Sequence, residues 1–162
     1  MPTAVTSYPV VMSLHIMAVV AAYGLRLAYP LLVPYMRRNH PRAMPGLHDV
    51  QHRLNQRLTG PGTALLFVFG AYMASKHHYW DEVWVDVPLA ILVAIVVLGG
   101  WIVSATGRLS KLAQGDLEAS GPGEVAWGSD YEGLYRRYMA IEILLGGLVL
   151  TAIFFMTAKP FS

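Results

Sequence analysis

The chain has 162 residues, of which 55% are hydrophobic and only 14% are charged. This composition, with a mean hydropathy of +0.44, indicates an integral membrane protein rather than a soluble one. The absence of cysteine excludes disulfides, thiolate metal sites and cysteine nucleophiles. The sequence pI is near 9.0, but the basic residues flank apolar stretches, which is a topology signal. We therefore expect one membrane domain, residues 1–162, and no nucleic-acid partner.

Four apolar stretches predict an all-α fold, a four-transmembrane-helix bundle. Each stretch approaches the roughly 20 residues that cross a hydrocarbon core of about 30 Å. The second is interrupted by Gly60-Pro61-Gly62, which is tolerable if neighbouring helices satisfy the freed backbone groups. Residues 115–130 are rich in glycine and serine and predict an irregular loop. The predicted helices span about 9–36, 47–75, 87–114 and 131–158.

The distribution of basic residues predicts the orientation. The side opposite the two basic segments has only Lys76 and Lys159, so the positive-inside rule places both termini outside the cytoplasm. Trp80 and Trp84 fit an interfacial aromatic belt on that outer side. No Lys or Arg precedes the first stretch, so we expect a retained helix rather than a secretory signal peptide. The basic segments carry Arg37, Arg38, Arg42, Arg53 and Arg57, and Arg108, Lys111, Arg136 and Arg137.

Two charged residues lie inside apolar stretches, Arg26 in the first and Glu142 in the fourth. A charge in hydrocarbon is costly, so each should face the bundle interior and find a partner. At about 1.5 Å per residue, they lie roughly 9 Å and 6 Å from the inner ends of their stretches. We therefore predict an Arg26–Glu142 ion pair in the cytoplasmic half. Such a pair is either purely structural or part of a functional site, and the sequence leaves both interpretations open.

His15 precedes Arg26 by eleven residues, about three helical turns. The two residues should therefore share one face of the first helix with Val19 and Ala22. A neutral imidazole at this depth is a core residue with one hydrogen bond, a metal or haem ligand, or a proton relay. All three roles remain open for His15.

Other histidines and small residues carry weaker signals. His48 and His52 are four residues apart, a spacing that can bind a metal, but no third ligand is evident. A polar helix end beside headgroups is the favoured interpretation of this pair. Gly100 and Ser104 form a small-residue step that predicts close packing of the third helix.

Short motifs along most of the chain form a further pattern. They are His15-Ile16, Val19, Gly24-Leu25, Pro30 and Leu32, then Arg57, Leu58, Thr59, Pro61, Phe69 and Gly70, then Gly107-Arg108-Leu109, and finally Glu142 and residues 158–161. In these elements the chain resembles the HemJ-type protoporphyrinogen oxidases and related four-helix families such as the DUF2269 integral membrane proteins.

The resemblance implies a protein of the bacterial inner (plasma) membrane with a b-type haem site. The histidine that the HemJ-type family uses around its haem matches His15, and Arg26 would lie near a propionate, with Glu142 as its partner in the cofactor-binding set. Asp86 and Pro88 stand where the HemJ-type enzymes have a histidine and a lysine. The resemblance therefore implies haem binding more directly than porphyrinogen oxidation.

Three functions are compatible with the sequence. The first is a membrane redox protein that binds haem b through His15. The second is a small transporter or permease-like module with Arg26 and Glu142 along a polar path. The third is a non-catalytic accessory subunit in which the charged pair only fixes helix packing. The expected partners are the lipid bilayer and a second copy of the chain or a larger membrane complex.

Overall fold

Four helical rods make up residues 7–160, the part of the chain that the computed structural model describes. Each rod is long and apolar enough to cross a membrane, and this part of the chain contains no strand, which confirms the predicted all-α four-helix bundle. The main helices are α1 (Ser7–Tyr23), α2 (Tyr29–Asn39), α3 (Met44–Leu54), α4 (Gly60–His77), α5 (Val83–Ser120) and α6 (Ser129–Ala158). The short helical segments are η1 (Arg26–Ala28), η2 (Pro41–Ala43), η3 (Asn55–Thr59) and η4 (Tyr79–Asp81).

The first rod is interrupted where a single continuous helix was predicted. α1 ends at Tyr23, the 3-10 turn η1 follows, and α2 starts with a proline in its first turn. At Gly24 a Cβ atom would lie 2.6 Å from the carbonyl oxygen of Val20, so only glycine fits this backbone. Proline is tolerated in a first helical turn because its missing amide would be unpaired there anyway. The interruption changes the helix only locally, because the first rod still covers the predicted residues.

The second rod is continuous but irregular. It runs from α3 through η3, a π-helical segment, into α4. Pro61 lies in the first turn of α4, directly after the π turn. A proline clashes with the carbonyl four residues earlier in a regular helix, and a wider π turn relieves that conflict. The chain therefore does not break at Gly60-Pro61-Gly62. The π turn just before these residues accommodates the proline.

The third rod is longer than predicted. α5 continues to Ser120, so residues 115–120 belong to a helix and the loop is confined to residues 121–128. Ser120 Oγ accepts a hydrogen bond from the Ala126 amide at 3.0 Å, and Asp116 Oδ2 accepts one from the Gly128 amide at 2.8 Å. The helix stops at Gly121, whose φ of 62° favours glycine. The loop thus folds back onto the end of α5. The glycine-rich composition of residues 115–130 predicts a loop where this helix end lies.

Helix packing places an apolar core between the rods and leaves apolar surface outside. α5 packs mainly on α6 and α3, and α1 packs on α4. A Cβ at Gly62 would lie 2.9 Å from Ala22 Cβ, whereas one at Gly100 would meet nothing within 4 Å. Close helix approach therefore occurs between α1 and α4, not at the predicted step in the third rod. Large apolar residues such as Met17 and Leu31 are 64% and 80% exposed, as lipid-facing positions are.

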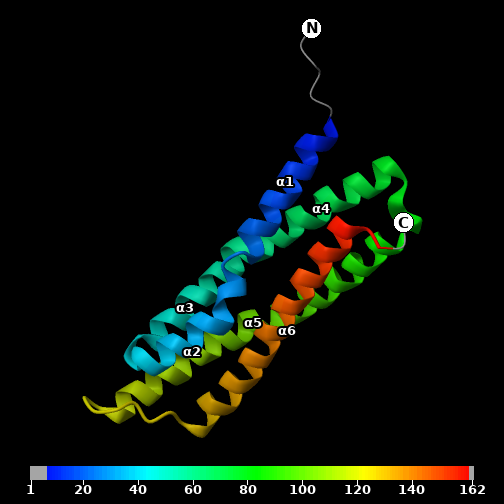
Figure 1. The fold of residues 1–162 in the computed structure, drawn as a ribbon. Coiled ribbons are helices and arrows are strands. Elements are labelled where there is room, and N and C mark those ends of the chain that lie inside the picture. The colour runs from blue at the N-terminus through cyan, green and yellow to red at the C-terminus, as the bar shows by residue number, and fades with distance from the viewer. Residues whose placement is uncertain (1–6, 161–162) are drawn as a thin grey trace.

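The connections separate into two ends (Figure 1). The start of α1, the α4–α5 connection and the end of α6 lie together, and we call this the outer end. The α2–α3 and α5–α6 connections lie at the other end, called the inner end, and most of the basic residues lie on the helices that lead into and out of these connections. The two basic segments therefore share one side, as predicted. Which end faces the cytoplasm stays a prediction from the positive-inside rule.

Candidate functional site

A cavity of about 430 Å³ opens between the helices in the outer half of the bundle. Its walls come from α1, α4, α5 and α6, with η4 at the outer end, and they are overwhelmingly apolar and aromatic. The volume lies in the range of pockets that bind small molecules and cofactors. The residues that line the cavity include His15, Leu66, Gly70, Tyr79, Trp84 and Lys159.

His15 is the exceptional residue of this cavity. The residue is only 6% exposed, and neither Nδ1 nor Nε2 has a hydrogen-bond partner among residues 7–160. The backbone of Leu66 is near the ring, but it does not form a hydrogen bond with either ring nitrogen. Buried polar side chains are nearly always paired, so an imidazole in this condition requires an explanation.

Gly70 on α4 makes room for the imidazole. A Cβ at this position would lie 3.3 Å from His15 Cε1, which is tighter than most Cβ contacts, and 3.7 Å from Nδ1, an ordinary contact distance. The Nδ1–Cε1 edge therefore faces α4, and Leu66 is one turn earlier on the same helix. Nε2 lies farther from Gly70 and is the nitrogen left to meet a ligand.

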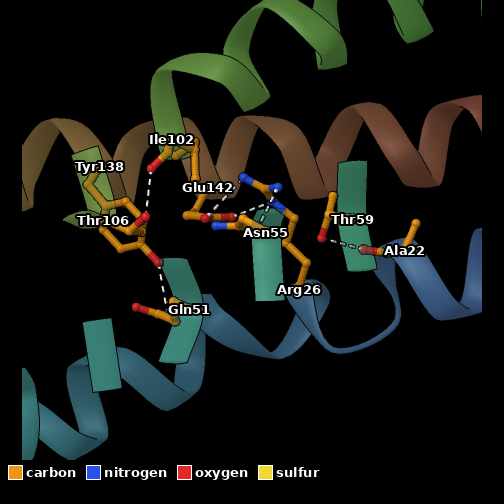
Figure 2. Close-up of polar contacts among 9 residues, drawn as sticks. All are labelled: Ala22, Arg26, Gln51, Asn55, Thr59, Ile102, Thr106, Tyr138 and Glu142. Atoms are coloured by element: carbon orange, nitrogen blue, oxygen red, sulfur yellow. Dashed lines mark hydrogen bonds and ion pairs between the residues drawn. The ribbon is translucent and has the colours of Figure 1, made fainter. Parts of the chain in front are cut away.

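The predicted pair of buried charges is present below the cavity (Figure 2). Arg26 Nε donates to Glu142 Oε2 at 2.9 Å, and Nη2 donates to Oε1 at 3.2 Å. The two residues are 5% and 1% exposed. A third contact runs from Arg26 Nη1 to Asn55 Oδ1 at 3.5 Å. This bidentate geometry is the strong form of an arginine–carboxylate interaction and confirms the sequence-based ion pair.

The irregular parts of both rods meet at this ion pair. Arg26 is the first residue of η1, and Asn55 is the first residue of η3. The carbonyl of Ala22, near the end of α1, accepts a hydrogen bond from Thr59 Oγ1 at 3.2 Å. In an uninterrupted helix that carbonyl would accept from the amide four residues later. The π segment therefore satisfies the backbone that the interruption of the first rod releases, as a membrane interior requires.

A second polar layer lies toward the inner end. His48 Nδ1 is 3.0 Å from Gln51 Oε1, and Gln51 Nε2 donates to the Tyr138 hydroxyl at 3.0 Å. Because the Gln51 oxygen can only accept, Nδ1 carries the proton, and in the neutral ring Nε2 accepts from the Tyr131 hydroxyl at 3.1 Å. All four residues are at least nine-tenths buried.

The sequence signal for this layer is a polar stripe along one face of the second rod. His48, Gln51 and Asn55 recur at helical spacing, and all three are buried. His52 turns elsewhere, because its Nδ1 donates to the Val103 carbonyl at 2.8 Å and its ring packs on Gly107 of α5. His48 and His52 thus do not form a chelate. Within residues 7–160 no group of three or more histidine, cysteine, aspartate or glutamate residues could hold a metal ion.

The three residues predicted from the sequence occupy two places. His15 lines the cavity, while Arg26 and Glu142 bind each other and are not among its lining residues. A search of family models, of curated proteins and of solved structures finds no match to this chain.

Proposed function

We propose that the protein is an integral membrane protein that binds b-type haem in the outer-half cavity, with His15 as an iron ligand and a redox role. The observation that supports this proposal is the buried imidazole with two unpaired ring nitrogens on the wall of an apolar cavity. Burying a polar group without a partner is costly, and an iron ligand bond would remove that cost.

The surroundings of His15 suit a metal-ligating imidazole. Such a ring ligates through one nitrogen and directs the other N–H toward a carbonyl or carboxylate, which fixes its orientation. Here the Leu66 backbone is near the ring, and Gly70 leaves space for the ring to settle against α4. Haem, when bound, supplies one-electron chemistry whose potential depends on the axial ligand and on burial. The apolar walls would exclude water from it.

Arg26 and Glu142 have a supporting role in this proposal. Two nitrogens of the guanidinium are engaged by the carboxylate, and a third contacts Asn55. Contact between Arg26 and a haem propionate would require opening this ion pair. We infer that the pair joins the two irregular rods to α6 and so fixes the face of α1 that carries His15.

An absorption spectrum tests the proposal. The protein purified in detergent from cells supplied with haem precursor should show a Soret band and dithionite-sensitive b-type bands. His15→Ala should abolish this spectrum. His77→Ala is the matched control, because His77 is near the outer end of α4 but does not line the cavity. Wild-type protein without a Soret band overturns the proposal, and lipid or quinone extracted from the same preparation would identify a different apolar ligand.

A second candidate function, transport, is favoured by one observation. Interrupted helices that meet at buried charged groups are the arrangement of binding sites in many transporters. Arg26, Asn55 and Glu142 meet in this way, and no described residue accepts a hydrogen bond from Asn55 Nδ2. Proton flux into vesicles that contain the purified protein, abolished by Glu142→Gln, would support this function. An accessory subunit would instead copurify with a larger complex and show neither flux nor a haem spectrum.

A further inference from the structure

Lys159 at the outer end of the cavity is the basis of a further inference, which rests on the proposed haem site. Among the described residues that line the cavity, it is the only one with a fully charged side chain, and none is a carboxylate. Asp81, Glu82 and Asp86 are close in sequence to the lining residue Trp84 but do not line the cavity. The cavity therefore has apolar walls, one imidazole and one cation.

Aromatic rings hold this cation at the mouth. Lys159 Nζ lies 4.6 Å from the ring centroid of Trp84 and 5.6 Å from that of Tyr79. These two rings contact each other edge to face, with their centroids 5.0 Å apart. An ammonium over aromatic faces is attracted to them without losing its hydrogen-bond donors. All three residues line the cavity, so the ammonium group is available to a ligand there.

The backbone at Lys159 is also unusual. Lys159 has a φ of 43°, a left-handed conformation, and its amide donates to the Phe155 carbonyl at 3.1 Å. This geometry ends α6 and is normally taken by glycine, because a side chain makes it less favourable. A lysine here can also serve the negative end of the helix dipole alone. The two explanations differ in what a change of the ligand's charge should do.

We propose that Lys159 binds the acidic edge of the tetrapyrrole, so that its propionates lie at the outer mouth of the cavity, beside Tyr79 and Trp84. Arg26, which the sequence alone suggested for this role, is occupied by Glu142. An amphiphile with a carboxylate at one edge and an apolar body matches a cavity that is cationic at its mouth and apolar elsewhere. His15 and Lys159 would then fix both the depth and the rotation of the ligand.

Binding of free acid and ester forms of the same ligand tests this proposal. Iron protoporphyrin IX and its dimethyl ester, and the two metal-free counterparts, are titrated into purified protein at pH 7.4. The readouts are the Soret band and the quenching of tryptophan fluorescence, since Trp84 lines the cavity. The variants are Lys159→Gln, Lys159→Arg and, as the control, Lys76→Gln, which removes a charge from the outer end of α4 away from the cavity lining.

The wild type should prefer the acid over the ester, and Lys159→Gln should reduce this preference about tenfold, the lower end of what hydrogen bonds to charged groups contribute. Lys159→Arg and Lys76→Gln should retain it. An unchanged preference in Lys159→Gln overturns the role of Lys159 while leaving haem binding intact. Lys159-dependent binding of the metal-free acid, without a histidine-ligated spectrum for the iron form, supports Lys159 and overturns His15 ligation. Failure of all four ligands to bind the wild type overturns both proposals.

Discussion

The buried pair of Arg26 and Glu142 gives the sharpest test of the bundle, through the variants Arg26→Met, Glu142→Met and the double variant. Removing one member of a buried pair costs typically about 3–5 kcal/mol, whereas replacing both by apolar residues is often near neutral. Interhelical hydrogen bonds in membranes average only about 0.6 kcal/mol each. Loss of the two hydrogen bonds alone would therefore cost about 1 kcal/mol, and the remainder would come from the uncompensated charge.

The two single variants should differ in how their stability depends on pH. In Glu142→Met the guanidinium keeps only its 3.5 Å contact with Asn55 and cannot lose its proton. In Arg26→Met the carboxylate loses both donors, but it can become neutral by taking up a proton. We expect losses of about 3 kcal/mol for both at neutral pH. The loss in Arg26→Met should shrink as the pH is lowered. The folded variant then binds a proton at its buried carboxylate more readily than the unfolded chain does, so protonation favours the folded state.

Equilibrium unfolding in mixed micelles, followed by helical circular dichroism, measures these free energies. The double variant should be more stable than either single variant, with a coupling energy of at least about 2 kcal/mol. The control cycle uses Arg53 and Asp49, an exposed pair joined at 2.8 Å, for which we expect coupling within experimental error. Strictly additive losses for Arg26 and Glu142 would show that the two side chains do not meet. The haem spectrum should return with stability in the double variant if the pair is only structural.

Two further experiments test the orientation and the space beside His15. Cysteines placed at Arg42 and Gly123 should be labelled only from the cytoplasmic side and one at Asp81 only from outside, because the helices that flank the inner-end connections carry most of the basic residues. Labelling of Gly123→Cys from outside intact cells would reverse the orientation. Gly70→Leu should displace the imidazole and remove any haem spectrum while the protein stays folded. Gly99→Leu should leave the spectrum unchanged, because a Cβ there meets nothing within 4 Å. An unchanged spectrum in Gly70→Leu would show that haem binding does not depend on the position of the His15 ring.

The parts of the structure that followed from the sequence are those governed by the cost of charge in hydrocarbon. Arg26 and Glu142 could be paired from their depths alone, because each had to find a counter-charge inside the bundle. The face of the first rod was predicted nearly correctly for the same reason: His15, Ala22 and Arg26 are buried, and Val19 is partly buried.

The parts that did not follow depend on contacts between distant segments. The carbonyl released at the end of α1 is satisfied by Thr59 of the second rod, and nothing near Ala22 in the sequence signals this bond. The extension of α5 likewise depends on Asp116 and Ser120 binding amides of the loop. Glycine and proline marked where each irregularity would fall, but not whether the chain would break, widen into a π turn or remain helical.

Comparison of two buried histidines gives the strongest reason to seek a ligand at His15. His48 is fully buried, and Gln51 and Tyr131 satisfy both of its ring nitrogens. The bundle thus provides partners for an imidazole where one is needed for packing. His15 has no such partner in the part of the chain that the structure describes, and its cavity has overwhelmingly apolar walls, whereas a buried water molecule needs two to four polar partners. A partner that brings its own affinity for imidazole into an apolar space fits this position better than water does, and haem iron is such a partner.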